Sequence, residues 1–258
     1  MDNKSNFWNL SAAAIFLGLS IVAGTLIVGA TMYRIKNLAN NISVSGAAER
    51  VIKSDTVKWA SSFSRQVMVD QLKTGSAELK GDLTKVLAYF SGRDVAKEII
   101  QVQPPTMTVV CENQQYVTYD ASGLPTCGSG KIIGYNLQQN IIIESNEVDK
   151  ITALAQEAPA ALVDQGVIFN SKSLEYYYNK LADLKLEMMG EATKNAMERA
   201  SRIAESTGRK INQVQSATMG VFQVTSVNST DISDYGFYDT SAIQKKVTAV
   251  VRASFDLK

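Results

Sequence analysis

The chain has 258 residues, with 26 Lys and Arg against 25 Asp and Glu, two cysteines and no histidine. The absence of histidine excludes Ser-His-Asp and Cys-His catalytic pairs and zinc sites that use imidazole. Binding to the phosphates of a nucleic acid requires an excess of Lys and Arg, and the net charge of +1 shows that this chain has none to speak of. We therefore expect no nucleic-acid partner. No catalytic constellation is visible, and we expect no enzymatic activity, no cofactor and no bound metal.

An uncharged, apolar stretch runs from Leu10 to Met32. At about 1.5 Å per residue, a helix of this length measures roughly 35 Å, enough to cross the hydrocarbon core of a membrane. We therefore expect a flank over 1–9, an uncleaved transmembrane anchor over 10–33 and a connector over 34–41. The alternative is a secretory signal peptide cleaved near Val28-Gly29-Ala30, although signal peptides usually have shorter apolar regions.

Small residues recur four positions apart in this stretch, a spacing that lets membrane helices approach each other closely. One such pair is Ala14 and Gly18, and a second is Ser20 and Gly24. Both pairs are candidate contacts between copies of the chain, with plain exposure to lipid as the alternative.

The orientation of the anchor depends on two opposing signals. Arg34 and Lys36 follow the span whereas only Lys4 precedes it, and this asymmetry weakly favours a cytoplasmic domain. Cys111 and Cys127 flank a polar, turn-rich segment, and a disulfide between them would persist only in an oxidising compartment. Free thiols are the alternative. We favour the disulfide and a domain outside the cytoplasm.

The stretch from Ile42 to Lys258 alternates between period-2 and helical patterns, which predicts an α+β fold with a mixed or antiparallel sheet packed against long helices. The predicted strands lie over 42–48, 57–69, 98–111 with a break at Pro104-Pro105, 134–144, 166–173, 211–224 and 246–257. The predicted helices lie over 79–90 with Gly92 as the cap, from 148 onward with Ser145 or Asn146 as the cap and Pro159 ending or kinking it, and over 181–204 with Gly208 as the stop.

Two of these segments carry additional information. An Ala-rich line along the helix over 181–204 permits close approach of a neighbouring element. Apolar and polar residues alternate in the final strand, which favours antiparallel pairing with one buried face.

A loop rich in Asn, Ser, Asp and Tyr is predicted over 225–242. Its aromatic residues Tyr235, Phe237 and Tyr238 either pack back onto the domain or contact a neighbouring subunit, because aromatic side chains are enriched at binding surfaces. The same alternatives apply to Tyr176-Tyr177-Tyr178, for which packing within the domain is favoured.

Two weaker motifs are interpreted as ordinary loops. Gly128-Ser-Gly-Lys131 resembles a phosphate loop, but Ile132 occupies the position that needs Ser or Thr. The carboxylates of Asp231, Asp234 and Asp239 could bind Ca²⁺, yet their spacing lacks the glycine and the terminal glutamate of an EF-hand.

The order of several motifs resembles the SIMPL domain family of bacterial envelope proteins, over nearly all of 42–258. The motifs are Ile42 to Val51, Asp55 to Trp59, Ile99 to Pro104, Ile133 to Asn136, Gln165 to Phe169 and Ala200 to Gly208. The resemblance implies an extracytoplasmic protein linked to envelope or oxidative stress that tends to self-associate, with no catalytic site to transfer. The segment between the two cysteines and the uncleaved anchor depart from the family pattern.

We therefore expect a single-pass protein of the bacterial inner membrane whose domain lies in the periplasm and forms a homo-oligomeric ring or cage with a structural or scaffolding role. The alternatives are an enzyme that uses carboxylates or tyrosines in a cleft, and a monomeric binding module for an envelope partner.

Overall fold

The computed structural model describes residues 3–38, 40–112, 118–123, 125–128 and 130–258, with side-chain environments over 16–33 for the first helix. The chain folds into two compact units. The N-terminal unit comprises Met1–Ala48, Leu186–Val221 and Ala249–Lys258, and the central unit comprises Glu49–Lys185 and Phe222–Thr248. The segment from Ile42 to Lys258 is shared between the two units.

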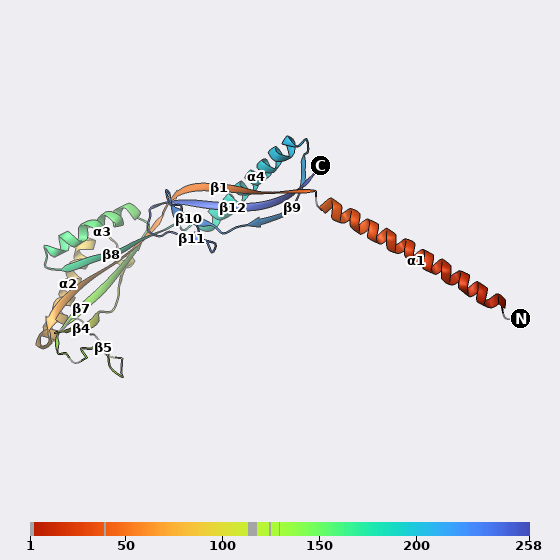
Figure 1. The fold of residues 1–258 in the computed structure, drawn as a ribbon. Helices are drawn as coiled ribbons and strands as arrows, with labels where there is room; N and C mark the ends of the chain where they lie inside the picture. Colours follow the sequence, from red (N-terminus) through yellow and green to blue (C-terminus); the bar gives the residue numbers. More distant parts are fainter. Residues whose placement is uncertain (1–2, 39, 113–117, 124, 129) are drawn as a thin grey trace. The chain divides into compact units, whose positions relative to one another are not determined.

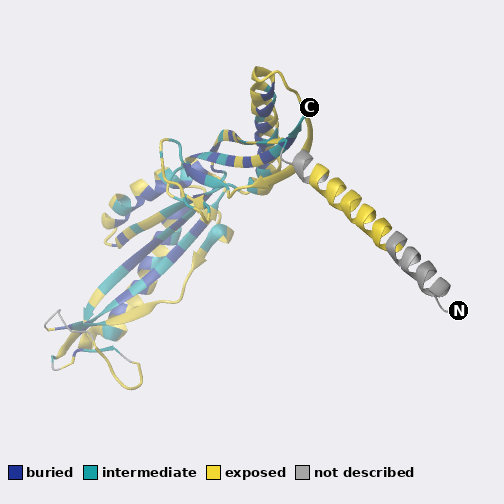
Figure 2. Cartoon of the chain, turned by 45° about the vertical axis from the view of Figure 1, so that its right-hand side comes forward, coloured by how far each residue is buried: buried dark blue, intermediate teal, exposed yellow. Residues whose placement is uncertain are grey.

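The first helix, α1 (Asn3–Leu38), is longer than the predicted span and takes up most of the predicted connector. It contains an apolar segment, Phe16–Tyr33, that is long enough to cross a membrane and is entirely exposed (Figure 2). The strand β1 (Asn41–Lys53) begins almost immediately afterwards. A helix that is apolar and exposed all round is typical of a membrane anchor or of a signal sequence.

The central unit is built on an antiparallel sheet in the order β3-β7-β2-β8, with β4 also paired to β7. The strands are β2 (Thr56–Met68), β3 (Ile100–Val102), β4 (Thr106–Cys111), β7 (Ile132–Ser145) and β8 (Ile168–Tyr177). The helices α2 (Leu72–Ser91) and α3 (Val148–Val163) pack against it, and short 3-10 turns occupy Val69–Gln71 and Lys97–Ile99. A small hairpin, β5 (Thr118–Tyr119) with β6 (Pro125–Thr126), follows β4.

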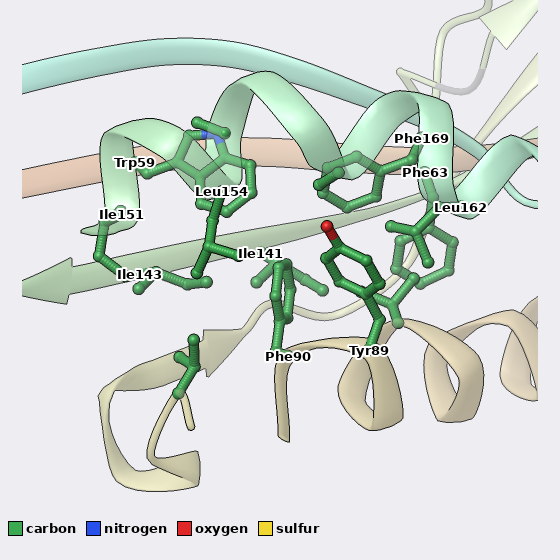
Figure 3. Packing of buried hydrophobic residues seen from close by; sticks show 14 of the residues in the cluster. Trp59, Phe63, Tyr89, Phe90, Ile141, Ile143, Ile151, Leu154, Leu162 and Phe169 are labelled. Carbon is green, nitrogen blue, oxygen red and sulfur yellow. The ribbon is translucent and has the colours of Figure 1, made fainter. Parts of the chain in front are cut away.

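Period-2 alternation places the large apolar residues of this sheet on its helix-covered face. Trp59 is fully buried and meets Phe90 and Phe169 edge to face, with ring centroids 5.6 and 5.9 Å apart. Figure 3 shows Ile141 and Ile143 of β7 in the same cluster as Trp59 and Phe90. Burial of each of these side chains stabilises the folded state by on the order of 2 kcal/mol.

The predicted break at Pro104-Pro105 is confirmed. β3 and β4 pair with successive parts of β7 and are separated by Gln103 and the two prolines. The buried Gln139 side chain donates a hydrogen bond of 2.6 Å to the Gln103 carbonyl, which satisfies part of the interrupted strand. Proline lacks the N–H group that a continuous ladder would need there.

The helix boundaries match the predictions in part. Gly92 caps α2, and its N–H donates to the Ala88 carbonyl. The cap position of α3 is Glu147 rather than Ser145 or Asn146, and no side chain caps it. Of the two alternatives for Pro159, an end or a kink of the helix, the end is wrong, because α3 continues to Val163. Burial of Ala158 and Leu162 in the core supports the turn that follows the proline.

In the N-terminal unit, the final residues of β12 (Gln244–Leu257) pair with β9 (Ile211–Met219), and β1 lies on the other side of β12. The predicted antiparallel pairing and one-sided burial of β12 are confirmed. The predicted strand over 211–224 is two strands, β9 and β10 (Gln223–Ser226), because the ladder along β12 is interrupted after Met219. The division between the two units falls in this interruption.

The helix α4 (Leu181–Ser206) packs its Ala-rich line onto the sheet of the N-terminal unit. Ala196 and Ala200 are fully buried against Ala253 and Phe255. The backbones approach so closely that a Cβ atom on Gly46 of β1 would lie 2.2 Å from the Ala192 carbonyl oxygen. The predicted close approach along this helix is therefore confirmed, and Gly208, with φ +75°, follows the helix as predicted.

Candidate functional sites: apolar helix, disulfide and aromatic loop

The apolar helix has no partner within the described chain along Phe16–Tyr33. Gly18 and Gly24 have no atom within 4 Å of the position that a Cβ would occupy. The Ser20 hydroxyl donates to the carbonyl oxygens of Phe16 and Leu17, so its polar group is satisfied within the helix. Ala14 lies outside the residues whose side chains are described. Gly18, Ser20 and Gly24 are therefore accessible to another helix or to lipid.

Cys111 and Cys127 form the predicted disulfide, with their Cα atoms 5.5 Å apart. Cys111 ends β4 and is buried, while the segment that the bond closes carries the β5–β6 hairpin. Tyr119 in this hairpin is 72% exposed. The bond thus fixes the two ends of an excursion from the edge of the central sheet.

The three aromatic residues of the loop over 225–242 have different environments. Tyr235 is 97% exposed, whereas Phe237 and Tyr238 are 41% and 37% exposed. Phe237 and Tyr238 form the short strand β11 (Phe237–Tyr238), which pairs in parallel with β10. The Tyr238 ring stacks on Tyr177, and its hydroxyl accepts a hydrogen bond from the Tyr178 N–H. Tyr238 thus packs back onto the central unit, while Tyr235 projects into solvent.

The predicted packing of the tyrosines at the end of β8 holds for Tyr176, which is buried in the core. Its neighbour Tyr177 donates a hydrogen bond of 2.6 Å to the Glu175 carboxylate. This bond, together with burial, raises the pKa of Tyr177 to about 12. The hydrogen bond to Glu175 therefore favours the protonated form of Tyr177.

A buried lysine, Lys245 of β12, holds the aromatic loop. Its ammonium donates to the carbonyl oxygens of Asp239 and Ala242, the latter at 2.6 Å. Burial lowers the pKa of Lys245, against the opposing charge of Asp239. Partial burial raises the pKa of the Asp239 carboxyl, but two hydrogen bonds of 2.7 Å from Ser241 and the charge of Lys245 outweigh it, so that the pKa lies below its usual value. No sequence pattern marks Lys245 as buried.

A polar hollow of about 390 Å³ in the central unit is lined by Glu98, Glu144, Thr56, Asn146 and Asn179 among others. Its amide and hydroxyl groups bond to each other: the Asn179 Nδ2 donates to the Thr56 Oγ1 at 2.6 Å, and Thr56 donates to the Asn146 Oδ1 at 3.1 Å. Catalysis by a nucleophile needs a base within hydrogen-bond reach of it. The two carboxylates make no such bond to Thr56 in the described structure.

The two weaker motifs form no site in the described part of the chain. Asp231 is bonded to Ser229 within its own turn, and no group of three metal-ligating side chains occurs among the described residues. The Gly128 to Lys131 segment lies partly outside the described residues, and Gly130 closes a tight turn on the Cys127 carbonyl.

Two structural features were not predicted. β9 is an edge strand whose residues after Ile211 are exposed on both faces. Such a strand presents unpaired backbone groups to other chains. In the central unit, the buried carboxylate of Asp82 pairs with Arg65, which also reaches Glu78 at 2.9 Å. This network joins α2 to β2 and satisfies a charge that burial would otherwise make costly.

An exposed apolar N-terminal helix combined with a disulfide-bonded α+β domain is typical of proteins that are anchored in a membrane or exported across one. The model of the SIMPL family, described as a protein of unknown function (DUF541), matches residues 42–255. The chain therefore belongs to the SIMPL family, as the resemblance of its motifs predicted. The comparison with curated proteins finds no match.

Proposed function

We propose that this protein is a single-pass protein of the bacterial inner membrane, anchored by α1, whose SIMPL domain lies in the periplasm. There it assembles into a homo-oligomeric ring or cage that serves as a scaffold in the envelope, in connection with stress. The observation that carries the proposal is the apolar segment Phe16–Tyr33, which is exposed all round on a chain that also holds a disulfide.

The helix supports both anchoring and association. At about 100° per residue, the pair Ala14 and Gly18 and the pair Ser20 and Gly24 fall on two lines about 120° apart. Small residues on two separate lines allow a helix to contact two neighbours at once. A ring needs this arrangement, because each subunit uses one surface toward each neighbour.

The domain offers further surfaces for self-association. Tyr235 is almost fully exposed, and β9 is an exposed sheet edge. Phe237 and Tyr238 are partly available, since each retains more than a third of its exposure. Anchoring raises the local concentration of the domains, so weak contacts at these surfaces can complete an assembly.

The experiment that tests the assembly is native mass determination of the full-length chain in a mild detergent. We expect a large, defined oligomer. The double substitution Gly18→Leu and Gly24→Leu should reduce its mass, because leucine side chains keep helices apart where glycine lets them touch. Ala30→Leu is the matched control, because Ala30 lies away from both lines of small residues.

Removal of residues 1–33 should loosen the assembly and leave the circular dichroism spectrum of the domain in place, because the domain's sheets and cores do not involve α1. A full-length chain that stays monomeric at micromolar concentration would contradict the proposed assembly.

A further inference from the structure

The base of the N-terminal unit is the point at which the chain leaves α1. The Asn40 carbonyl accepts a hydrogen bond of 3.0 Å from the Leu257 N–H, and the Asn40 side chain donates one of 3.2 Å to the Leu257 carbonyl. The Arg209 guanidinium donates to the Asn40 side chain. The C-terminus therefore lies beside the start of β1 (Figure 1).

This base carries three exposed cations. Arg209 contacts Asn40 directly, and Lys210 and Lys258 exchange two backbone hydrogen bonds of 3.0 and 2.7 Å. All three side chains are exposed, and none forms an ion pair with a carboxylate in the described part of the chain. We call Arg209, Lys210 and Lys258 the basic collar.

Two acidic residues lie close to the collar in the sequence. Asp256 accepts a hydrogen bond from the Gln215 side chain of β9, and Glu205 belongs to the last turn of α4. With the α-carboxylate of Lys258, three negative charges balance the three cations of the collar in number, and Arg34 and Lys36 at the end of the apolar segment add the excess of positive charge.

Covalent connection keeps the collar near the membrane. The apolar segment ends at Tyr33, the helix at Leu38, and Asn40 is already bonded to the collar. Five helical residues rise about 7.5 Å, and two extended residues add at most about 7 Å. Asn40 therefore lies no more than roughly 15 Å beyond the end of the apolar segment, whatever the angle between α1 and the domain. The headgroup layer is about 5 to 7 Å thick, and electrostatic attraction extends about 8 Å further.

We propose that the basic collar binds the phosphate groups of anionic phospholipids at the membrane surface and thereby holds the N-terminal unit against the bilayer. The proposal rests on the part of the proposed function in which α1 spans the membrane, and it does not depend on oligomerisation. Anionic lipid is the occupant because the collar is cationic, lacks carboxylate partners and is tied by seven residues of chain to the lipid surface itself.

The test uses full-length protein in a mild detergent, titrated with fluorescent phosphatidylglycerol or fluorescent phosphatidylcholine. We expect preference for phosphatidylglycerol. The triple variant Arg209→Gln, Lys210→Gln and Lys258→Gln should lose about tenfold or more in affinity, because each cation near an anionic surface contributes about 1 kcal/mol. The matched control removes three exposed lysines of the central unit, Lys80→Gln, Lys97→Gln and Lys131→Gln, and should bind as the unchanged protein does.

Because Arg209 also bonds to Asn40, the double variant Lys210→Gln and Lys258→Gln keeps the test valid if the triple variant is unstable. Equal binding by collar and control variants would overturn the proposal, as would displacement of the lipid by an equal concentration of inorganic phosphate. Resistance of the protein to carbonate extraction from membranes tests the anchor separately: if the chain resists extraction but shows no preference for anionic lipid, the collar fails and the anchor stands.

Discussion

Lys245 and Asp239 show how single side chains hold an irregular loop. The buried ammonium of Lys245 bonds to two loop carbonyls, and the Asp239 carboxylate binds the N–H and hydroxyl groups of Ser241. The Asp239 N–H donates to Val224 of β10 at 2.8 Å. Tyr238 is thereby held next to Tyr177, while Tyr235, three residues earlier, remains free to contact another molecule.

The low pKa of Asp239 leads to a prediction about acid stability. Because the folded pKa lies below the unfolded value, the carboxylate contributes stability above about pH 4, and this contribution is lost as pH falls through the folded pKa. Asp239→Asn should lower the free energy of unfolding by about 1 kcal/mol at pH 7 and by much less near pH 3. Urea titrations at the two pH values measure this difference.

Asp234→Asn is the matched control, because Asp234 is exposed in the same loop. It should change the stability little at either pH. An Asp239→Asn effect of the same size at pH 3 and pH 7 would show that the charge of Asp239 plays no part.

At the scale of elements, the contact between β1 and α4 depends on the absence of a side chain at Gly46. A Cβ atom there would lie 2.2 Å from the Ala192 oxygen and 2.3 Å from the Ala196 nitrogen, and both are backbone atoms that cannot move alone. Gly46→Ala should therefore destabilise the protein by about 2 kcal/mol or more. Thermal unfolding followed by circular dichroism measures the loss.

Gly190→Ala, in the helix α4 on which β1 packs, is the control for this substitution. Gly190 has open space around it, so alanine there should raise stability by about 0.5 to 1 kcal/mol through its better helix propensity. If both glycines tolerate alanine equally, the close packing of β1 on α4 does not limit stability.

The disulfide belongs to the same scale, because it joins two residues 16 positions apart in the sequence at the edge of the central sheet. Replacing Cys111 and Cys127 together by Ser should lower the free energy of unfolding by about 3 kcal/mol, mainly because the unfolded chain gains freedom. The oligomer should stay intact, since neither cysteine belongs to the proposed contact surfaces. Thiol titration of the native, unreduced protein should find no free thiol.

At the scale of the whole molecule, orientation in the membrane decides whether the disulfide can persist. Lys and Arg close to a span favour the cytoplasmic side, but long segments and whole domains translocate largely regardless of their charge. The disulfide requires an oxidising compartment. We therefore expect protease added to intact spheroplasts to degrade the domain, with a cytoplasmic protein as the control for membrane integrity. Protection of the domain from the protease would contradict the proposed orientation.

The amino-acid sequence by itself determined the features that depend on local periodicity or on the number of residues of one type. The apolar segment, the alternation of Val57 and Trp59 in β2, and the Ala-rich line of α4 are visible without tertiary information, because each pattern repeats within one element. The disulfide was predictable because Cys111 and Cys127 have no competitors.

Only the tertiary structure decided the features that depend on contacts between distant segments. The burial of Lys245, the stacking of Tyr238 on Tyr177 and the division of the predicted strand over 211–224 all follow from pairing partners elsewhere in the chain. At the base of the N-terminal unit, Asn40 likewise bonds to Arg209 and to Leu257, which lie 169 and 217 residues further along the sequence. A single sequence carries no local signal for such contacts, because the side chains that meet are set by sheet register and by the path of the chain.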